Sequence, residues 1–327
     1  MKATELRNNI SEGKDLDIQK LVIIKKKTWL EELIERFNTR AQAKFYIEHS
    51  GGSWGYYEDA HSQYYRALEL FKKNIPKDLK FQIIEREFLP NFLFNKSDLI
   101  VPIGPDGLVI NTAKYLDSQY IFAVNPDKER IDGILIPFEV TDIKDALRAI
   151  NNGNEKVKKI TMAKAKLNNG QNIHGVNDLF IGHQSHMSAR YSLKFTGQKE
   201  NQSSSGIIIS TGCGSTGWFR SIVTGAIGIA SSFREIKDQT RENDYRFNWN
   251  SDYLYFSVRE PFESKLSKTN IIFGRITKTN PLIIESNMPE NGVIFSDGIE
   301  KDFLDFNSGT IANISIADRK VNLLVKE

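Results

Sequence analysis

The segment Leu99–Leu108, LIVPIGPDGL, decides how the N-terminal half of the chain is interpreted. An apolar run ends here in Gly104-x-Asp106-Gly107, and a helical pattern follows. Pro-Asp-Gly is common in tight turns, because proline fixes φ at the first corner and glycine accepts a left-handed backbone. A strand, a glycine-flanked acid and a helix in this order are also typical of a phosphate-binding loop. Within these residues alone, a plain turn and a phosphate loop are both open.

Apolar runs alternate with helical patterns on both sides of this segment. Thr28 is a plausible N-cap for a helix, and residues 56–73 repeat apolar side chains at helical spacing. Strands alternating with helices favour a parallel sheet, so we expect a Rossmann-like α/β domain over residues 1–140. The predicted strands are 21–24, 81–86, 97–104 and 120–125, and a further predicted helix is 108–116.

The pattern changes after about residue 140. Residues 141–153 predict one more helix, and Asn169-Gly170 between alternating runs predicts a hairpin that joins 158–167 to 176–182. We therefore expect a β-rich, sandwich-like domain over residues 141–327, whose last residues are candidates for packing back on the first domain. Its other predicted strands are 190–195, 206–211, 253–260, 270–276, 281–286, 292–297 and 310–317, and a helix at 218–236 precedes a polar loop at 237–244.

The composition is that of an ordinary soluble protein. The chain has 327 residues with 40% hydrophobic and 26% charged side chains, enough for two domains. A net charge of +3 is too balanced to predict a nucleic-acid or membrane partner. A single cysteine excludes an internal disulfide and fits a reducing compartment. The N-terminus contains acids and lacks the apolar segment of a signal peptide, so we expect a cytoplasmic protein.

A second glycine-rich segment, STGCGSTGW, contains Gly-x-Gly-x-x-Gly over residues 212–217, between a predicted strand and a predicted helix. A dinucleotide fingerprint also needs a second parallel strand that ends in an acid, and no strand leads to Glu235. The segment therefore predicts a nucleotide cradle more than a dehydrogenase. Cys213 is interpreted as a small turn residue, the pair at His183 and His186 as a loop between strands with no metal site, and Asp297-Gly298 as a hairpin corner.

Several segments together resemble the NAD kinase family, most closely its mitochondrial-type branch. They are similar to the family's Gly-Gly-Asp-Gly-Thr loop, its Asn-containing segment, its Asn-Glu or Asn-Asp motif and its Thr-Gly-Ser-Thr-Ala-Tyr region, and they occur in the family's order over roughly residues 95–317. The segments are PIGPDGLVINTAKYL (102–116), FAVNPDKERIDGIL (122–135), GVNDLFIG (175–182), SSSGIIISTGCGSTGW (203–218), LYFSVREPF (254–262) and IFSDGIEKDFLDFNSGTIANISI (294–316).

The resemblance implies an enzyme that transfers the ATP γ-phosphoryl group to the 2′-hydroxyl of the adenosine ribose of NAD. ATP and NAD are then substrates, Mg²⁺ accompanies ATP, and a homodimer or homotetramer is expected. Asp106 is implied as the acid at the 2′-hydroxyl, with Gly104 and Gly107 in the phosphate turn. Residues implied to bind NAD are Asn125, Asn177, Asp178, Ser215, Thr216, Gly217 and Trp218, the last by stacking.

The phosphate loop departs from the family pattern at two positions. Pro105 replaces the second glycine and removes an N–H, and Leu108 replaces the threonine. Loss of one charge-assisted hydrogen bond costs roughly 1.5–3 kcal/mol. Ser205 stands where many members have an acid, but the mitochondrial-type branch also tends to lack that acid. Two alternatives follow: an inactive or weakened dinucleotide-binding relative, and a related kinase of a lipid or sugar hydroxyl.

Overall fold

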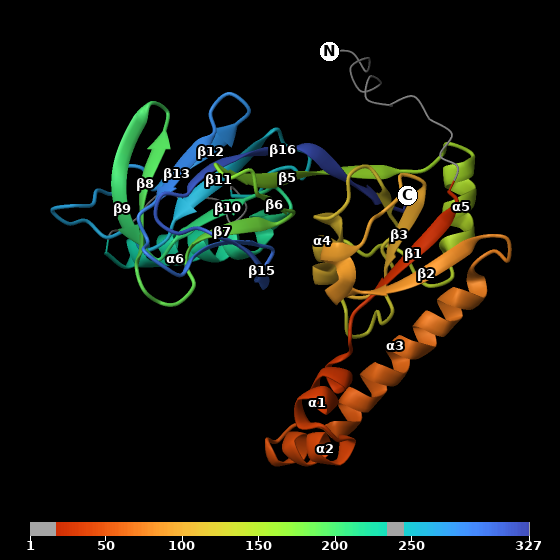
Figure 1. The fold of residues 1–327 in the computed structure, drawn as a ribbon. Coiled ribbons are helices and arrows are strands. Elements are labelled where there is room, and N and C mark those ends of the chain that lie inside the picture. Colours follow the sequence, from red (N-terminus) through yellow and green to blue (C-terminus); the bar gives the residue numbers. More distant parts are fainter. Residues whose placement is uncertain (1–17, 234–244, 327) are drawn as a thin grey trace. The chain divides into compact units, whose positions relative to one another are not determined.

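The computed structural model describes residues 18–233 and 245–326, which divide into two compact units (Figure 1). The first unit contains the chain up to Leu108, Gln119–Val157 and the residues from Leu324 on. The second contains Val109–Ser118 and Lys158–Leu323. This division differs from the predicted 1–140 and 141–327: Lys114 pairs with Asp302 of the second unit, whereas Ile143, Leu147 and Ile150 pack in the core of the first.

A parallel sheet in the order β2-β1-β3-β4 forms the centre of the first unit. β1 pairs with both β2 and β3, and its apolar residues Leu21–Ile24 are completely buried. Such a run, apolar on both faces, is typical of a strand covered by helices on each side. The strands are β1 (Lys20–Lys25), β2 (Lys80–Glu85), β3 (Asp98–Pro102) and β4 (Tyr120–Ile121).

The strand order produces a topological switch point between β1 and β3. The chain leaves β1 to reach β2 on one side of the sheet and leaves β3 to reach β4 on the other. Loops that leave neighbouring parallel strands in opposite directions open a crevice at the carboxyl ends, where α/β proteins bind ligands. The segment after β3 is the predicted phosphate loop.

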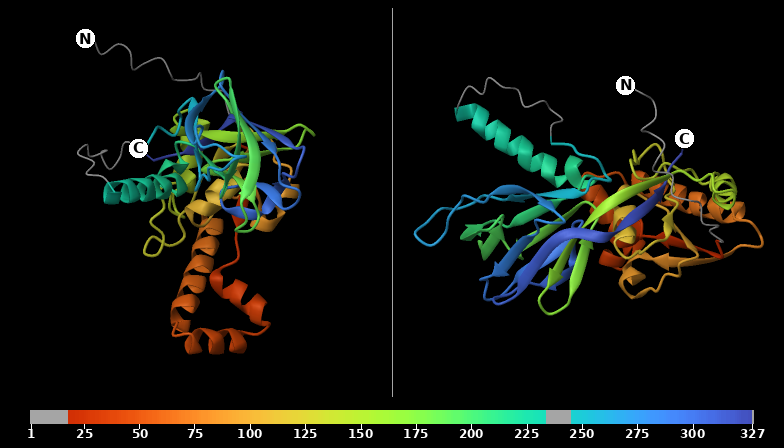
Figure 2. Two further views of the ribbon diagram at one scale, coloured as in Figure 1. Left: turned by 90° about the vertical axis from the view of Figure 1, so that its left-hand side faces the viewer. Right: turned by 90° about the horizontal axis from the view of Figure 1, so that it is seen from above.

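Helices cover the sheet and extend beyond it. The predicted N-cap is confirmed: Thr28 caps α1 in a capping box with Glu31. Side chains of α3 and α5 pack against the buried strands, whereas α2 packs on α1 and the start of α3 in a separate small cluster (Figure 2). The helices are α1 (Trp29–Phe37), α2 (Arg40–His49), α3 (Trp54–Asn74), the short η1 (Arg86–Asn91), α4 (Asp106–Ala113) and α5 (Ile143–Asn151).

Two sheets build the second unit. One has the order β16-β13-β8-β9, with β5 on β16 and β6 on β5; the other has the order β12-β11-β10-β7-β14-β15. The first comprises β5 (Val157–Leu167), β6 (Asn172–Gly175), β8 (Ala189–Phe195), β9 (Gln198–Ser204), β13 (Leu282–Ser286) and β16 (Ile311–Leu324). The second comprises β7 (Asp178–His183), β10 (Ile207–Ser210), β11 (Tyr253–Val258), β12 (Phe273–Thr277), β14 (Gly292–Ser296) and β15 (Ile299–Asp305).

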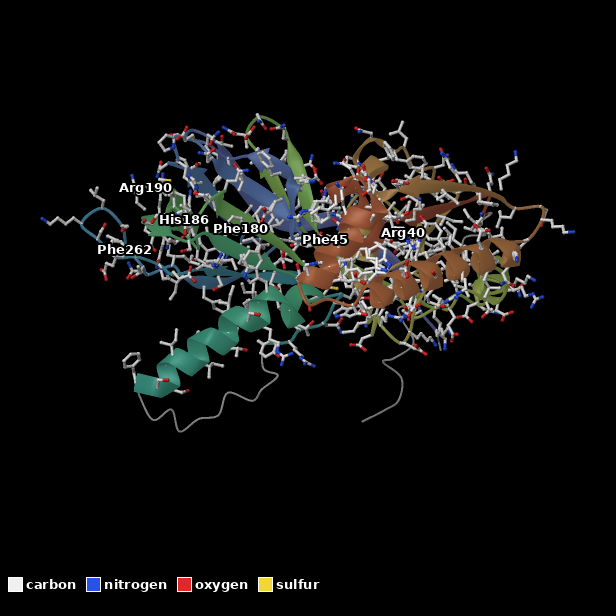
Figure 3. All side chains as sticks on the ribbon, turned by 90° about the horizontal axis from the view of Figure 1, so that it is seen from below. Arg40, Phe45, Phe180, His186, Arg190 and Phe262 are labelled. Carbon is white, nitrogen blue, oxygen red and sulfur yellow. The ribbon has the colours of Figure 1, made fainter. Side chains whose placement is uncertain are left out.

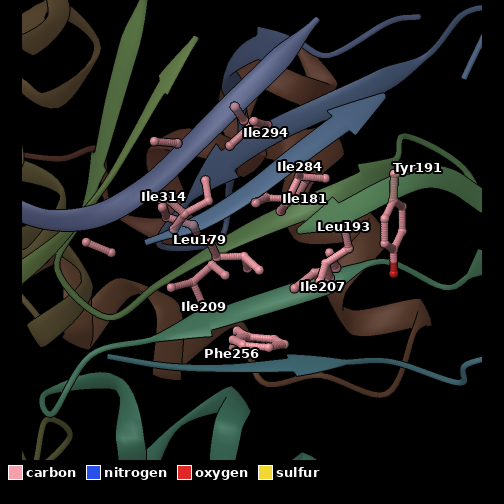
Figure 4. Close-up of a cluster of buried hydrophobic side chains, with 14 of the residues drawn as sticks. Leu179, Ile181, Tyr191, Leu193, Ile207, Ile209, Phe256, Ile284, Ile294 and Ile314 are labelled. Carbon is pink, nitrogen blue, oxygen red and sulfur yellow. The ribbon is translucent and has the colours of Figure 1, made fainter. Parts of the chain in front are cut away.

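One hydrophobic core joins these two sheets (Figure 4). Ile181, Ile209 and Phe256 come from one sheet, and Leu193 and Ile284 come from the other, and all five are completely buried. Two sheets around one core are the predicted sandwich, and the predicted fold class is confirmed.

Two predicted elements differ from the structure, and a third is described only in part. The turn at Asn169-Gly170 is present, but the returning strand is β6, and residues 178–183 form β7 in the other sheet. Residues 120–125 form only the short β4, followed by an isolated bridge at Val124. The helix predicted at 218–236 is α6 (Trp218–Phe233), and its last residues and the loop 237–244 lie outside the described residues. No helix in the described ranges is long and apolar enough to cross a membrane.

Because Phe256 is completely buried in the shared core, we expect its truncation to lower stability strongly. Phe256→Ala should lower the free energy of unfolding of the second unit by about 3–5 kcal/mol, because it removes a buried ring and leaves a cavity. Phe262→Ala is the matched control: this ring is 65% exposed, and its loss should change stability by less than about 0.5 kcal/mol. Urea unfolding followed by circular dichroism measures both, and equal effects would contradict the assignment of the core.

Candidate functional site

The phosphate loop is a turn between β3 and α4. Leu108 N–H donates to the Pro105 carbonyl at 2.8 Å and closes the turn. Gly104 has φ of 156°, and a Cβ there would lie 3.0 Å from Cδ2 of Leu108. The buried Leu108 side chain therefore occupies the space beside Gly104. Gly107 has open space where a Cβ would be, so its backbone is accessible from the crevice.

The carboxylate of Asp106 is held by the segment that follows β4. Ile134 N–H donates to Oδ2 and Leu135 N–H donates to Oδ1, each at 2.9 Å. Gly133 directs these N–H groups with a left-handed φ of 53°, and a Cβ there would lie 2.0 Å from the side chain of Ile136. Each oxygen of an ionised carboxylate can accept two hydrogen bonds, so Asp106 is oriented and still has acceptor capacity.

Asn125 organises the same segment. Its Nδ2 donates to the carbonyl of Ile131 at 2.9 Å, and its Oδ1 accepts the N–H of Asp127 at 2.9 Å. Asp127 in turn accepts the N–H groups of Glu129 and Arg130 and forms an ion pair with Arg130. Asn125 thus stabilises the loop that holds Asp106, and its contact with a nucleotide stays a prediction.

In the second unit, Asn177 and Asp178 lie where the chain enters β7, and Asp297 holds their backbone. Oδ1 of Asp297 accepts the N–H of Asn177 at 2.7 Å and that of Asp178 at 3.3 Å, while Oδ2 accepts the N–H of Val176 at 3.1 Å. Asp297-Gly298 is the predicted hairpin corner between β14 and β15, with φ of 55° and 70°. The same turn therefore closes a hairpin and fixes the Asn-Asp pair.

Burial changes the acidity of these two carboxyl groups. Burial raises the pKa of Asp178 to about 7, and the nearby Asp297 contributes in the same direction. Burial also raises the pKa of Asp297, to about 6, although three backbone N–H groups and Lys114 favour its ionised form. Lys114 is itself buried, and its Nζ donates to Ser296 at 3.3 Å and to Asp302 at 2.7 Å. Asp297, whose oxygens accept three backbone N–H groups, is therefore the more readily ionised carboxyl group of the pair, and burial favours the protonated form of Asp178.

The glycine-rich turn packs directly on Asn177. A Cβ at Gly214 would lie 2.0 Å from the carbonyl oxygen of Asn177, so only glycine fits. The N–H of Thr211 donates to that carbonyl at 2.9 Å, and the Thr211 hydroxyl donates to Val176. Gly212 is equally constrained, because its Cβ would lie 2.0 Å from the carbonyl oxygen of Asn248. The structure thus brings Asn177, Asp178 and the glycine-rich turn together.

The remaining predicted residues follow in this turn and the start of α6. Ser215 is buried, and its hydroxyl donates to the Gly212 carbonyl at 2.8 Å. Thr216 and Gly217 are exposed. The ring of Trp218 stacks on Phe180, which is labelled in Figure 3, at 5.8 Å between centroids. The guanidinium of Arg259 lies 5.4 Å from the centroid of the Trp218 ring.

Trp218, Phe180 and Arg259 form one wall of a cavity of about 310 Å³ in the second unit. His183, the last residue of β7, and His186, in the loop between β7 and β8, also line it. Within the part of the chain that the structure describes, no three His, Cys, Asp or Glu side chains group as a metal site. The lining of the cavity itself, aromatic faces with a few polar groups, is of the kind that organic-ligand sites have.

Sequence reasoning missed Asp297, Lys114 and Gly133 as site residues. An Asp-Gly corner predicts a turn whether or not its carboxylate reaches another strand. Lys114 is the one charged residue of the helical pattern 108–116, and this charge was the available signal. Gly133 had no signal that the segment after β4 would hold Asp106.

No family model matches the sequence, and no curated protein matches it. Solved structures share its fold, among them the following two. The structure of yeast NADH kinase complexed with NADH has a TM-score of 0.55 and 16% identity, and the alignment covers 94% of this chain and 84% of that one. The structure of an NAD kinase from Archaeoglobus fulgidus in complex with ATP has a TM-score of 0.53 and 14% identity, with 94% of each chain covered.

The chain has the two-domain fold of the NAD kinases. At these identities the likeness concerns the fold. It agrees with the order in which the resembling sequence segments occur, since the phosphate loop follows a parallel strand and the Asn-Asp pair opens a strand of the β-rich unit.

The raised pKa of Asp178 predicts a pH-dependent stability. The folded chain retains a proton that the unfolded chain has lost, so this group should make the free energy of unfolding fall as pH rises from about 4 to about 7. Asp178→Asn should flatten that slope, whereas Asp305→Asn, at an exposed position on β15, should leave it unchanged. Urea unfolding midpoints measured between these pH values give the slope of stability against pH. A slope unaltered by Asp178→Asn would refute the assignment of the raised pKa to Asp178.

Proposed function

We propose that the protein is an NAD kinase that transfers the γ-phosphoryl group of ATP to the 2′-hydroxyl of the adenosine ribose of NAD and forms NADP. The observation that carries the proposal is the oriented Asp106 at a switch-point crevice of the first unit. In the second unit, an Asn-Asp pair fixed beside a glycine-rich turn supports it. The shared fold supports it, and the resembling segments favour the mitochondrial-type branch.

Asp106 is the proposed acid–base residue. Its two backbone hydrogen bonds fix the carboxylate plane and leave lone pairs for the 2′-hydroxyl proton. A positioned carboxylate of this kind accepts the proton as the hydroxyl oxygen attacks the γ-phosphorus and the bond to the β-phosphate oxygen breaks. ADP is the leaving group, and the proton ends on Asp106 before it passes to water.

The second unit supplies the proposed contacts with NAD. Asn177 offers an amide donor and acceptor, and Asp178 offers a carboxyl group that is partly protonated near neutral pH, so the two can satisfy ribose hydroxyls in both directions. Trp218 provides a flat face for stacking, supported from behind by Phe180. In this proposal the Gly-x-Gly-x-x-Gly segment contacts NAD as a substrate, and no hydride is transferred.

Mg²⁺ is proposed to arrive bound to ATP. Mg²⁺ that arrives in this way is held mostly by substrate phosphates and one or two carboxylates. The ion shields phosphate charge when it is bound. Lys26 and Asp106, which both line the crevice, provide one positive and one negative side chain near such a complex.

Pro105 favours a second candidate, a dinucleotide-binding protein with weak or no transfer activity. The loop lacks the N–H that a glycine would offer, and Leu108 supplies no hydroxyl. The held position of Asp106 argues for the kinase. Stabilisation by NAD or NADP, but not by lipids or sugars, would separate both candidates from a kinase of other hydroxyls.

Asp106→Asn should lower kcat by roughly 10²–10⁴-fold, because an amide can fill the same space but cannot accept the proton. The measurement incubates the protein with Mg²⁺, ATP and NAD and follows NADP with an NADP-specific dehydrogenase. Asp145→Asn is the control, since this exposed residue of α5 pairs only with Arg148 among the described residues. Unchanged turnover in Asp106→Asn would remove Asp106 from the mechanism.

Pro105→Gly should raise kcat if the missing N–H weakens the phosphate loop. The restored charge-assisted hydrogen bond predicts a gain of roughly tenfold or more. Leu108→Thr is less informative, because Leu108 is buried against Gly104 and its loss also creates a cavity. An equal kcat in wild type and Pro105→Gly would mean that the loop binds phosphate without an N–H at this position.

A further inference from the structure

Lys114 is a buried cation of the second unit that takes no part in the proposed contacts with NAD. It directly follows α4, and its side chain is 3% exposed. An ammonium group at such a position destabilises a fold unless carboxylates and hydrogen-bond acceptors surround it. The groups around Lys114 therefore indicate what its charge does.

The ammonium group of Lys114 connects the two strands of the β14–β15 hairpin. Its Nζ donates to the hydroxyl of Ser296 at 3.3 Å, at the end of β14, and to Oδ2 of Asp302 at 2.7 Å, on β15. Tyr115 donates its hydroxyl to the same carboxylate of Asp302. Asp297 lies between these two contacts in the chain, directly after Ser296. Lys114 is thus bound on both sides of the turn that carries Asp297.

Three carboxyl groups surround this one positive charge. Asp302 forms the ion pair with Lys114, and Asp297 is attracted by the same ammonium group. Asp178, on β7, is repelled by the charge of Asp297. Because the charges act on one another, these groups titrate as a coupled set, and the single ammonium group decides which carboxyl groups stay ionised.

The next charged groups come from β16 and β6. Arg319 donates to the backbone carbonyl of Lys114 at 3.0 Å, pairs with Asp117, and lies 3.4 Å from Nδ1 of His174. Burial, together with the charge of Arg319, lowers the pKa of His174 to about 4. His174 therefore stays neutral between pH 6 and pH 8, and its titration does not disturb Lys114 in that range.

The hydrogen bonds of Asp297 depend on its ionisation. Its two oxygens accept three backbone N–H groups, those of Val176, Asn177 and Asp178. An ionised carboxylate accepts on both oxygens, whereas protonation converts one of them into a donor. Burial raises the pKa of Asp297 to about 6, and the charge of Lys114 acts in the opposite direction. Loss of that charge would thus release N–H groups at a pH where the wild type holds them.

We propose that Lys114 is a positioning residue: its ammonium group keeps Asp297 ionised, and the ionised Asp297 holds Asn177 and Asp178 in the arrangement that binds the dinucleotide. The identity of the ligand rests on the proposed function. The hold on the backbone does not, and it can be measured without a ligand.

Two substitutions should move the titration of Asp297 in opposite directions. Lys114→Met removes the attracting charge and keeps the length of an apolar side chain, so Asp297 should take up its proton at higher pH. Asp302→Asn removes the carboxylate that shares Lys114, so the ammonium group acts more strongly on Asp297, which should take up its proton at lower pH. A side chain that merely filled space would give no such opposition.

The test is amide hydrogen exchange of the full chain, read by mass spectrometry on a peptide that contains Val176–Asp178. Its protection in the wild type should be lost with a midpoint near pH 6. Lys114→Met should place the midpoint about one pH unit higher or more, and Asp302→Asn should place it lower. A peptide from β8, in the other sheet, corrects for the general effect of pH on exchange. Equal midpoints in all three proteins would overturn the inference.

Lys301→Met is the control variant, since Lys301 is exposed on β15 and forms no ion pair with any residue that the structure describes. It should keep the wild-type midpoint, and so should Lys114→Arg, which preserves the charge. If Lys114→Met does not fold, Asp302→Asn decides by itself, because the side chain of Asp302 is 37% exposed and its replacement should be tolerated. A midpoint that rises in Asp302→Asn would contradict the proposed role of Lys114.

Calorimetric binding of NAD connects the hold to the ligand. At pH 6.5, a pKa one unit higher leaves about a third of the ionised form, so Lys114→Met should raise the Kd of NAD about threefold or more. At pH 8.5 the Kd should equal that of the wild type. The KM for NAD should follow the same pattern while kcat is unchanged, because Lys114 does not reach the reacting groups in this proposal.

The outcomes separate this inference from the proposed function. If the wild type does not bind NAD, the proposed function fails, and the exchange midpoints decide whether Lys114 positions the Asn-Asp pair. If NADP is formed and Lys114→Met binds NAD at pH 6.5 as tightly as the wild type, the kinase proposal stands and the role of Lys114 is refuted.

Discussion

The carboxylate of Asp297 accepts hydrogen bonds from the backbone where the chain passes between the two sheets of the second unit. The chain leaves one sheet at the end of β6 and enters the other at β7, and backbone N–H groups at this crossing have no partner in either ladder. A buried N–H left unpaired costs about 1–3 kcal/mol. Asp297 accepts all three from Val176 to Asp178, so a single side chain on the β14–β15 turn makes the crossing tolerable. The same contact fixes the Asn-Asp pair on which ligand recognition would depend.

The crossing also explains the dinucleotide-like fingerprint. Gly214 lies against the Asn177 carbonyl and Gly212 against the Asn248 carbonyl, each at a distance that excludes a Cβ. These glycines are required by the approach of two backbones. A pyrophosphate is not needed to account for them, so the fingerprint spacing carries little weight as a sign of hydride transfer. Packing of the glycine-rich turn against Asn177 instead positions the residues that pass between the two sheets. The glycine-rich turn and the Asn-Asp pair therefore form one structural feature.

Sequence patterns predicted those elements whose burial is regular. β1 and β3 are continuous apolar runs, and α3 repeats its buried residues at helical spacing, so local sequence was sufficient for each. Three elements without that regularity were missed: α2, which buries only Ala43 and Ile47, and the polar strands β9 and β15. The hairpin partner of β5 was wrong because Gly175 and Val176 lie at the crossing, and nothing local distinguishes a crossing from a continuing strand.

The same limit applies to the candidate site. Asp106, Asn177 and Asp178 could be singled out because they flank strands in motifs of known chemistry. Their partners Ile134, Leu135 and Asp297 could not, since a backbone N–H or a turn carboxylate becomes a partner only when distant segments meet. The raised pKa of Asp178 is likewise a consequence of its burial in the fold.

Holding the acid and binding phosphate are separate tasks in the phosphate loop. The position of Asp106 depends on N–H groups of Ile134 and Leu135, and none of its hydrogen bonds comes from residue 105. Pro105 contributes its carbonyl to the turn, which proline provides as well as glycine does. Proline in place of glycine therefore removes a backbone N–H that could donate to a phosphate, and it leaves the acid in place. Because proline also restricts the unfolded chain, the substitution makes the turn more rigid.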